Sequence, residues 1–187
     1  MKCMVIDGNS IINRAYYGIR PLTNREGLYT HAVFGFLTTL LRLKEEERPD
    51  ALCVTFDLHA PTFRHKADEA YKATRKPMPE ELRPQLPLVR KMLEAMHVRI
   101  CELEGYEADD LLGTAARLAN ERGIHAYVLT GDRDSLQLVG GETEIILTRK
   151  GITESLLLDA QGVYDTYGFP PAQLPDMKGL MGDASDN

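Results

Sequence analysis

The chain has 187 residues, enough for one domain with a buried core and too few for two comfortable ones. Hydrophobic residues make up 43% and charged residues 27%, which are ordinary values for a soluble globular protein, and no apolar run is long enough to cross a bilayer. The formal net charge of −6, taken alone, argues against a polyanionic partner such as nucleic acid.

The first residues are expected to form a β-strand rather than a secretion signal, because their apolar run is short and is broken by Asp7. The three cysteines, Cys3, Cys53 and Cys101, are odd in number, widely spaced and each set in a strand-like run. Without a paired Cys or His spacing a zinc site is not expected, and buried free thiols are typical of a reducing compartment. We therefore expect a cytoplasmic protein with no membrane partner.

Along the chain, short apolar runs alternate with amphipathic stretches. The expected strands are residues 2–6, 51–56, 98–101, 126–129 and 144–147. Apolar residues recur at helical spacing in residues 32–43, 84–96 and 111–119. Strands that alternate with helices of this length are typical of βαβ units. The pattern therefore predicts an α/β fold with a mostly parallel central sheet flanked by helices on both faces.

One long stretch, residues 61–84, interrupts this alternation. It is polar and basic, has three prolines between positions 77 and 84, and leaves room for only a short helix around residues 67–74. Its basic residues are interleaved with aromatic ones: Arg64, Lys66, Lys72, Arg75 and Lys76, with Phe63 and Tyr71. Such a mixture is typical of single-stranded nucleic-acid binding, and a solvated loop is the plainer alternative. Arg14, after the first strand, is either a further phosphate contact or an ordinary surface arginine.

Acidic residues follow four of the expected strands. Asp7 and Asp57 come directly after the first two strands. Two clusters follow the third and fourth strands: Glu107, Asp109 and Asp110, and then Asp132 and Asp134. A single Asp after a strand is usually a turn former or a helix cap. Because the carboxyl ends of parallel strands share one edge of a sheet, however, we expect these seven carboxylates to meet in one crevice.

Two further acids, Asp183 and Asp186, are harder to place. Their spacing puts them on one face of a helix, and a polar tail is the alternative. If all nine acids belong to one site, the remaining scaffold has 19 acidic against 22 basic residues, a net charge of +3. A nucleic-acid substrate is then permitted.

Crowded carboxylates repel one another, and a helix N-terminus offsets only about 0.3–1 kcal/mol per charge. Divalent cations would supply the rest, and oxygen ligands without thiolate or imidazole select Mg²⁺, Mn²⁺ or Ca²⁺. Two ions about 3.5–4 Å apart would use so many oxygens better than one ion would. Such a pair is suited to in-line displacement at phosphorus.

Recognisable motifs span nearly the whole chain. They are VIDGNS at residues 5–10, Arg14, PLTN at 21–24, FD at 56–57, TFR at 62–64, YK at 71–72, Arg75, EADD at 107–110, TGDRD at 130–134 and LMGDASDN at 180–187. In these motifs and their order the chain resembles the 5′-nuclease domain found at the amino end of bacterial DNA polymerase I, in the flap endonuclease superfamily.

The resemblance implies a PIN-like α/β fold with a basic helical arch or clamp, in one 5′-nuclease catalytic domain over residues 1–187. It implies two Mg²⁺ (or Mn²⁺) ions, the first held by Asp7, Asp57, Glu107 and Asp109 and the second by Asp110, Asp132, Asp134, Asp183 and Asp186. It implies catalytic roles in the arch for Lys72 and Arg75, and phosphate contacts for Arg14 and Arg64. From the basic stretch itself we expect further DNA contacts at Lys66, Tyr71 and Lys76. The implied reaction is phosphodiester hydrolysis at a 5′ flap, a nick or a 5′ end of DNA, or at an RNA primer, in replication and repair.

Two departures from the family pattern stand out. Lys66 occupies a position where an acidic residue is expected. The given sequence also ends at Asn187, where a helix-hairpin-helix segment, and in the polymerase a polymerising domain, would follow. A non-cleaving module that holds branched DNA is therefore the main alternative. A phosphatase of the haloacid dehalogenase type is a weaker one, because Asn9 stands where that chemistry needs a second aspartate.

Overall fold

The computed structural model describes residues 1–68, 70–73, 77–149 and 154–182. Its strands are β1 (Lys2–Asp7), β2 (Ala51–Thr55), β3 (Arg99–Cys101), β4 (His125–Thr130), β5 (Thr143–Thr148) and β6 (Ser155–Leu158). Its helices are α1 (Gly8–Gly18), α2 (His31–Glu47), α3 (Phe63–Ala67), α4 (Gln85–Ala95), α5 (Ala108–Glu121), α6 (Ala160–Tyr167) and α7 (Leu174–Met181), with 3₁₀ turns η1 (Arg133–Leu138) and η2 (Pro171–Gln173). Within these ranges no helix has both the length and the apolar character needed to span a membrane.

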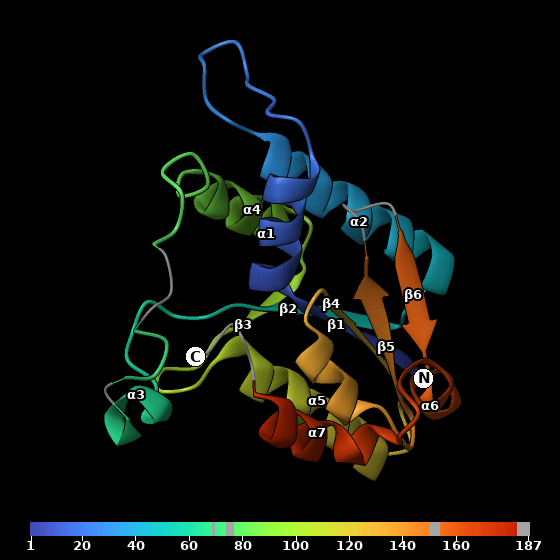
Figure 1. Cartoon of the computed structure of the whole chain (residues 1–187). Helices are drawn as coiled ribbons and strands as arrows, with labels where there is room; N and C mark the ends of the chain where they lie inside the picture. The colour runs from blue at the N-terminus through green and yellow to red at the C-terminus, as the bar shows by residue number, and fades with distance from the viewer. Residues whose placement is uncertain (69, 74–76, 150–153, 183–187) are drawn as a thin grey trace.

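The strands form one sheet in the order β3-β2-β1-β4-β5-β6 (Figure 1). Neighbours from β3 to β5 run parallel, and β6 pairs with β5 in the antiparallel direction. The predicted α/β fold with a mostly parallel sheet is confirmed. Because β1 has β2 on one side and β4 on the other, the chain order reverses between β1 and β4. In open parallel sheets such a reversal creates a crevice at the carboxyl ends of the strands.

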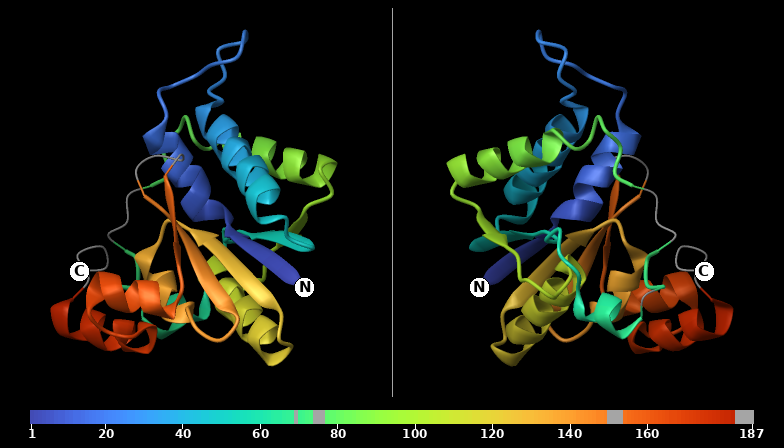
Figure 2. Two further views of the ribbon diagram at one scale, coloured as in Figure 1. Left: turned by 90° about the vertical axis from the view of Figure 1, so that its right-hand side faces the viewer. Right: turned by 90° about the vertical axis from the view of Figure 1, so that its left-hand side faces the viewer.

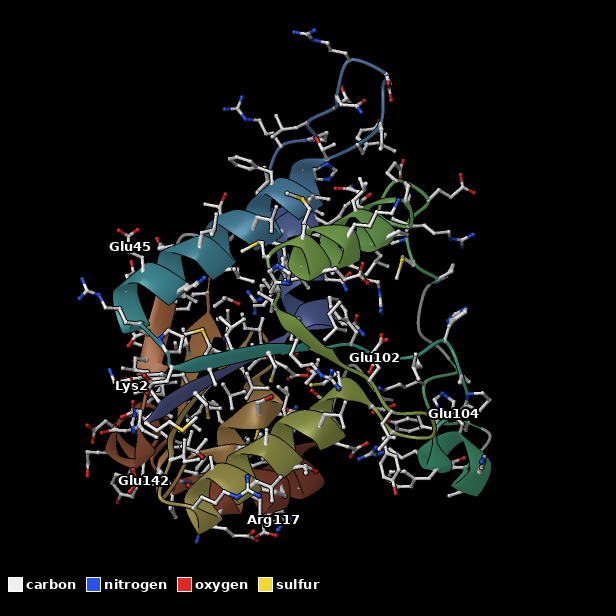
Figure 3. The ribbon with its side chains drawn as sticks, turned by 180° about the vertical axis from the view of Figure 1, so that it is seen from behind. Lys2, Glu45, Glu102, Glu104, Arg117 and Glu142 are labelled. Carbon is white, nitrogen blue, oxygen red and sulfur yellow. The ribbon has the colours of Figure 1, made fainter. Side chains whose placement is uncertain are left out.

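Helices cover both faces of the sheet (Figure 2). Helices α1, α2 and α4 pack on one face, over a buried cluster that includes Ile6 and Phe36. Helices α5, α6 and α7 lie on the other, over a second cluster that includes Val5 and Leu112. Figure 3 shows the same layers from behind, with α2 and α4 above the sheet and α5 below it. Successive residues of β1 therefore enter different cores, which explains why the strands are apolar throughout.

Some elements were not predicted from the sequence pattern. Helix α1 starts with Gly-Asn-Ser, which are poor helix formers, although Ile11, Ile12 and Ala15 behind them form a buried stripe. Strand β6 and helices α6 and α7 are too short for a clear period. The short helix expected around residues 67–74 was misplaced. Thr62 and His65 form a capping box that starts α3 earlier, and residues 70–73 form turns.

The first residue of α1, Gly8, packs against Phe56, the residue that follows β2. Gly8 begins the helix directly after β1, and a Cβ atom at this position would lie 2.4 Å from the ring of Phe56. The Phe56 ring is buried, and the Arg90 guanidinium stacks 4.7 Å from its centroid on another side. Asp7 precedes Gly8 and Asp57 follows Phe56, so this contact fixes how far apart the two acids lie.

A buried glutamine caps α2 from a different helix. Thr30 precedes α2, but its side chain makes no capping hydrogen bond. Instead the buried Oε1 of Gln85 accepts hydrogen bonds from the N–H groups of Ala32 (2.8 Å) and Val33 (3.3 Å). Its Nε2 donates to the carbonyl of Glu81 (2.9 Å). The start of α4 therefore supplies the acceptor that the first turn of α2 lacks.

We predict that Gln85→Leu lowers the free energy of unfolding by about 1–3 kcal/mol, because two buried N–H groups lose their acceptor. Urea unfolding followed by circular dichroism measures the change. The control Gln161→Leu replaces an exposed glutamine of α6, and we expect a change within about 0.5 kcal/mol. Equal stability of Gln85→Leu and the wild-type protein would contradict the capping role.

Candidate functional site

A hollow of about 850 Å³ lies at the carboxyl edge of the sheet, where the strand order reverses. Five acidic residues line it: Asp7, Asp57, Glu107, Asp109 and Asp132. They come from the end of β1, the loop after β2, the start of α5 and the loop after β4. Segments far apart in the sequence thus deliver carboxylates to one place, which we call the acidic cleft.

Both carboxylate oxygens of Asp7 accept a hydrogen bond. Its Oδ1 accepts a hydrogen bond from the N–H of Ser10 (2.9 Å), which makes Asp7 the N-cap of α1. Its Oδ2 accepts from the hydroxyl of Thr130 (2.8 Å) at the end of β4. The side chain is only 4% exposed. Burial raises the pKa of Asp7 from 3.8 to about 7, and repulsion from Asp109 and Asp57 adds to the rise that the hydrogen bonds oppose.

Asp57 and Asp109 join the ends of three further segments. The Nδ2 of Asn9 donates to one oxygen of Asp57, and the N–H of Ala108 donates to the other (2.7 Å). Asp57 therefore bridges the starts of α1 and α5. Burial raises the pKa of Asp109 to about 6, and repulsion from Asp132 and Asp57 raises it further. Asp109 still faces the solvent of the cleft, so screening weakens these interactions relative to those of Asp7.

Two hydroxyl groups that the sequence analysis did not single out organise the loop after β4. Thr130 Oγ1 donates to Asp7 and accepts from the N–H of Asp132 (3.0 Å). Ser10 Oγ accepts from the N–H of Gly131 (2.9 Å). The spacing from Asp7 to Ser10 could have indicated the capping bond of the Ser10 N–H, but it carried no signal for the bond between the Ser10 hydroxyl and Gly131. Thr130 carried only a weak signal, since a threonine at a strand end is common.

Basic residues from the stretch after β2 are bonded to the rim of the cleft. Lys72 Nζ lies 2.8 Å from Glu107 Oε1, and the Tyr71 hydroxyl donates to Glu107 Oε2 (3.0 Å). Arg64 makes two parallel hydrogen bonds of 2.8 Å to Asp110. The Arg64 guanidinium is the main cause that lowers the pKa of Asp110 below its usual range. These ion pairs place the positive charges of Lys72 and Arg64 at the edge of the acidic cleft.

The remaining site residues of the sequence analysis fall into three groups. Asp110 and Asp134 are not among the described lining residues of the cleft, because Asp110 faces Arg64 and Asp134 pairs with Lys178. Lys66 is exposed on α3, and Arg14 points to the carbonyls of Gly131 and Arg149 outside the cleft. Four residues lie outside the described ranges: Arg75, Lys76, Asp183 and Asp186.

The cleft has the chemistry of a hard-cation site. Its five acidic groups offer oxygen ligands, and two histidines, His59 and His65, also line it. Burial raises the pKa of Asp7 and of Asp109, and repulsion from neighbouring carboxylates adds to the rise, so a cation would favour their charged forms. Among the described residues, no three Asp, Glu, His or Cys side chains converge on a single point as metal ligands do. Asp57 and Glu107 instead turn toward the protein donors Asn9, Ala108, Tyr71 and Lys72. The oxygen donors of the acidic set fit divalent ions.

We predict that the metal-free protein loses stability as the pH rises from about 5 to 7. Asp7 keeps its proton up to about pH 7 in the folded protein, but only up to about pH 4 in the unfolded chain. The folded state therefore binds more protons between these values, and its stability falls as the pH rises through them. Asp7→Asn keeps a capping oxygen and should remove a fall on the order of 2–3 kcal/mol.

Thermal unfolding in EDTA at several pH values measures this difference. The control Asp159→Asn changes another aspartate N-cap, that of α6, whose side chain is exposed. It should keep the wild-type pH profile. Mg²⁺ should stabilise the wild-type protein more at pH 8 than at pH 5. A pH profile unchanged by Asp7→Asn would show that this carboxyl group titrates normally.

The sequence matches the family described as "5'-3' exonuclease, N-terminal resolvase-like domain" over residues 2–168. It is 42% identical over 186 residues to DNA polymerase I of Bacillus subtilis (strain 168), which covers 100% of this chain and 21% of that protein. It is 40% identical over 187 residues to DNA polymerase I of Mycobacterium leprae (strain TN), which covers 98% of this chain and 20% of that one. The chain thus spans about a fifth of the length of the curated relatives it matches.

Solved structures share the fold at low sequence identity. The T5 D15 protein co-crystallised with metal ions has a TM-score of 0.76 and 18% identity, over 100% of this chain and 68% of that one. A complex of the T5 D15 flap endonuclease with DNA and metal ions has a TM-score of 0.72 and 19% identity, over 100% and 68% of the two chains. The fold expected from the resemblance is therefore confirmed. With a family match over most of its length, the chain belongs to the 5′-3′ exonuclease family, in its N-terminal resolvase-like domain.

Proposed function

We propose that the chain is the catalytic domain of a structure-specific 5′-3′ exonuclease and flap endonuclease. It would hydrolyse phosphodiesters at a 5′ flap, a nick or a 5′ end of DNA, or at an RNA primer, in replication and repair. The observation that carries the proposal is the acidic cleft, where five carboxylates from four segments meet beside bonded basic residues. The family match and the two T5 structures, one crystallised with metal ions and one with DNA and metal ions, support the same activity.

The acidic residues would hold two Mg²⁺ (or Mn²⁺) ions. For the first ion we propose Asp7, Asp57, Glu107 and Asp109, all of which line the cleft. For the second we propose Asp132, which also lines the cleft, with Asp110, Asp134, Asp183 and Asp186. When bound, such ions stabilise negative charge on the phosphate and lower the pKa of a water molecule. The protein's own part is to orient the carboxylates, which the N–H of Ser10, the hydroxyl of Thr130 and the side-chain amide of Asn9 do through hydrogen bonds.

The basic residues would bind and orient the nucleic acid. Lys72, with Arg75, is proposed as catalytic, because its ammonium group lines the cleft and contacts Glu107. A phosphate could replace Glu107 as its partner without burying an unpaired charge once cations occupy the carboxylates. The proposed DNA contacts are Arg14, Arg64, Lys66, Tyr71 and Lys76. Tyr71 would combine its hydrogen bond to Glu107 with ring stacking on an unpaired base.

The length of the relatives bears on the domain organisation, and the cysteines bear on the location. We propose that residues 1–187 form one catalytic domain of a longer protein with a C-terminal polymerase domain, because DNA polymerase I relatives are about five times as long as the matched region. The three free cysteines support a reducing, cytoplasmic location.

We predict that Asp109→Asn lowers Mg²⁺-dependent cleavage of a 5′-flap duplex on the order of 100-fold or more, because one carboxylate of the cation site is lost. Single-turnover assays with a labelled flap, performed on the full-length protein, measure the rate. The matched control Asp176→Asn changes an exposed aspartate of α7 and should keep the wild-type rate. Circular dichroism verifies that both variants are folded. Full activity of Asp109→Asn would contradict the assignment.

The same substrate separates the nuclease from a module that only binds branched DNA. With Ca²⁺ in place of Mg²⁺, fluorescence anisotropy measures flap binding while cleavage is suppressed. Binding without any hydrolysis in Mg²⁺ or Mn²⁺ would favour the non-cleaving module. We expect both binding and hydrolysis, since a pure binder gains nothing from carboxylates placed against phosphates.

A further inference from the structure

We propose that a second hollow, beside the acidic cleft, binds phosphate groups of the nucleic-acid strand. Its volume is about 540 Å³. Three arginines from separate elements line it: Arg14 of α1, Arg133 of η1 and Arg149 directly after β5. No carboxylate occurs among the described residues of its wall. This arginine pocket therefore concentrates positive charge without an internal counter-charge, in a protein whose net charge is −6.

Arg14 is held in place by main-chain groups. Its guanidinium donates to the carbonyl of Arg149 at the end of β5 and to the carbonyl of Gly131 at the end of β4 (2.7 Å). A Cβ atom at Gly131 would lie 2.2 Å from Arg14 Nε, so only glycine leaves room for this arrangement. The guanidinium has five N–H donors, and a planar group oriented in advance loses little entropy when it binds an anion.

The other two arginines of the pocket are not paired with acidic side chains, which is also true of exposed arginines elsewhere in the described chain, such as Arg20 and Arg122. What sets Arg133 and Arg149 apart is that they line one hollow together with Arg14. Arg64, Arg90 and Arg117 each pair with a carboxylate. In the described ranges Arg133 and Arg149 have no carboxylate within 4.0 Å. An anion from outside is the natural partner for such a pair of guanidinium groups, and Arg recognises phosphate with particularly good geometry.

The rest of the wall suits a sugar-phosphate strand better than a free ion. Thr148, Thr166 and Tyr167 also line the hollow. The hydroxyls of Thr148 and Thr166 donate to the carbonyls of Thr130 and Gly162, whereas Tyr167 offers a phenolic hydroxyl, a group that commonly contacts phosphate and sugar in nucleic-acid complexes. Apolar groups of Leu147 and Leu156 complete the wall. Inorganic phosphate has no apolar part to place against these leucines.

The two hollows adjoin through consecutive residues. Asn13 and Asp132 line the acidic cleft, and the residues that follow them, Arg14 and Arg133, line the arginine pocket. A strand with one phosphate in the cleft would therefore bring nearby phosphates to the arginines. This inference rests on the proposed nuclease function, and it adds Arg133 and Arg149 as strand-positioning residues.

The test compares Arg133→Ala, Arg149→Ala and the double variant with Arg117→Ala, in the full-length protein. Arg117 is exposed on α5 and is labelled in Figure 3. Flap binding is measured in Ca²⁺ by anisotropy over a series of KCl concentrations. We expect each pocket variant to weaken binding about 3- to 10-fold and to reduce the slope of log K against log [KCl] by roughly 0.7–0.9 per arginine. Arg117→Ala should change neither quantity, and the Mg²⁺ concentration for half-maximal cleavage should stay the same in all variants.

The outcomes separate this inference from the proposed function. If the wild-type protein binds and cuts the flap but the pocket variants match Arg117→Ala in affinity and salt slope, the arginine pocket does not bind the strand. If inorganic phosphate raises the melting temperature of the wild-type protein but not of the double variant, while flap affinity is unchanged, the pocket takes a free anion and the strand proposal is overturned. If the wild-type protein neither binds nor cuts flap DNA, the proposed function itself fails.

Discussion

Asp7, Asp57 and Asp109 repel one another at the carboxyl edge of the sheet, and the rest of the structure is arranged around this repulsion. A parallel sheet cannot avoid bringing its strand ends together, so acids placed after β1, β2 and β4 must meet. The reversal of strand order between β1 and β4 then opens the crevice that receives them. The fold brings the charges together and holds them there, because the helices that pack on both faces keep the strands in register.

The protein meets this repulsion in two different ways. Inside the cleft, fixed donors hold the carboxylates: Thr130 and the Ser10 N–H on Asp7, and the Ala108 N–H on Asp57. At the rim, long cationic side chains do the same for Glu107 and Asp110. Fixed donors orient a carboxylate permanently, whereas a lysine or arginine on a long stem can exchange partners. The arrangement thus combines carboxylates fixed by short donors inside the cleft with carboxylates at the rim whose lysine and arginine partners can exchange.

Much of the architecture followed from the sequence because its signals were local. The apolar runs located β1 to β5, and the helical periods located α2, α4 and α5. The meeting of Asp7, Asp57, Glu107, Asp109 and Asp132 followed from parallel topology alone. The sequence could not show that Asp110 turns to Arg64, since this pair joins residues 46 positions apart. Nor could it show that Arg14 is held by the carbonyls of Gly131 and Arg149, because main-chain acceptors leave no trace in residue identity.

The contact between Gly8 and the Phe56 ring has a consequence for how such a domain can diversify. The two residues carry no charge and are not among the described residues that line the acidic cleft, yet together they act as a spacer between the carboxylates of Asp7 and Asp57. A methyl group in place of one hydrogen would push the helix start away from the aromatic ring and widen the gap between the two acids. Ion selectivity depends on cavity size as well as on ligand type. If the two acids hold divalent ions as proposed, the preference for a small or a larger ion would therefore depend partly on the Phe56 ring and on the missing side chain of Gly8.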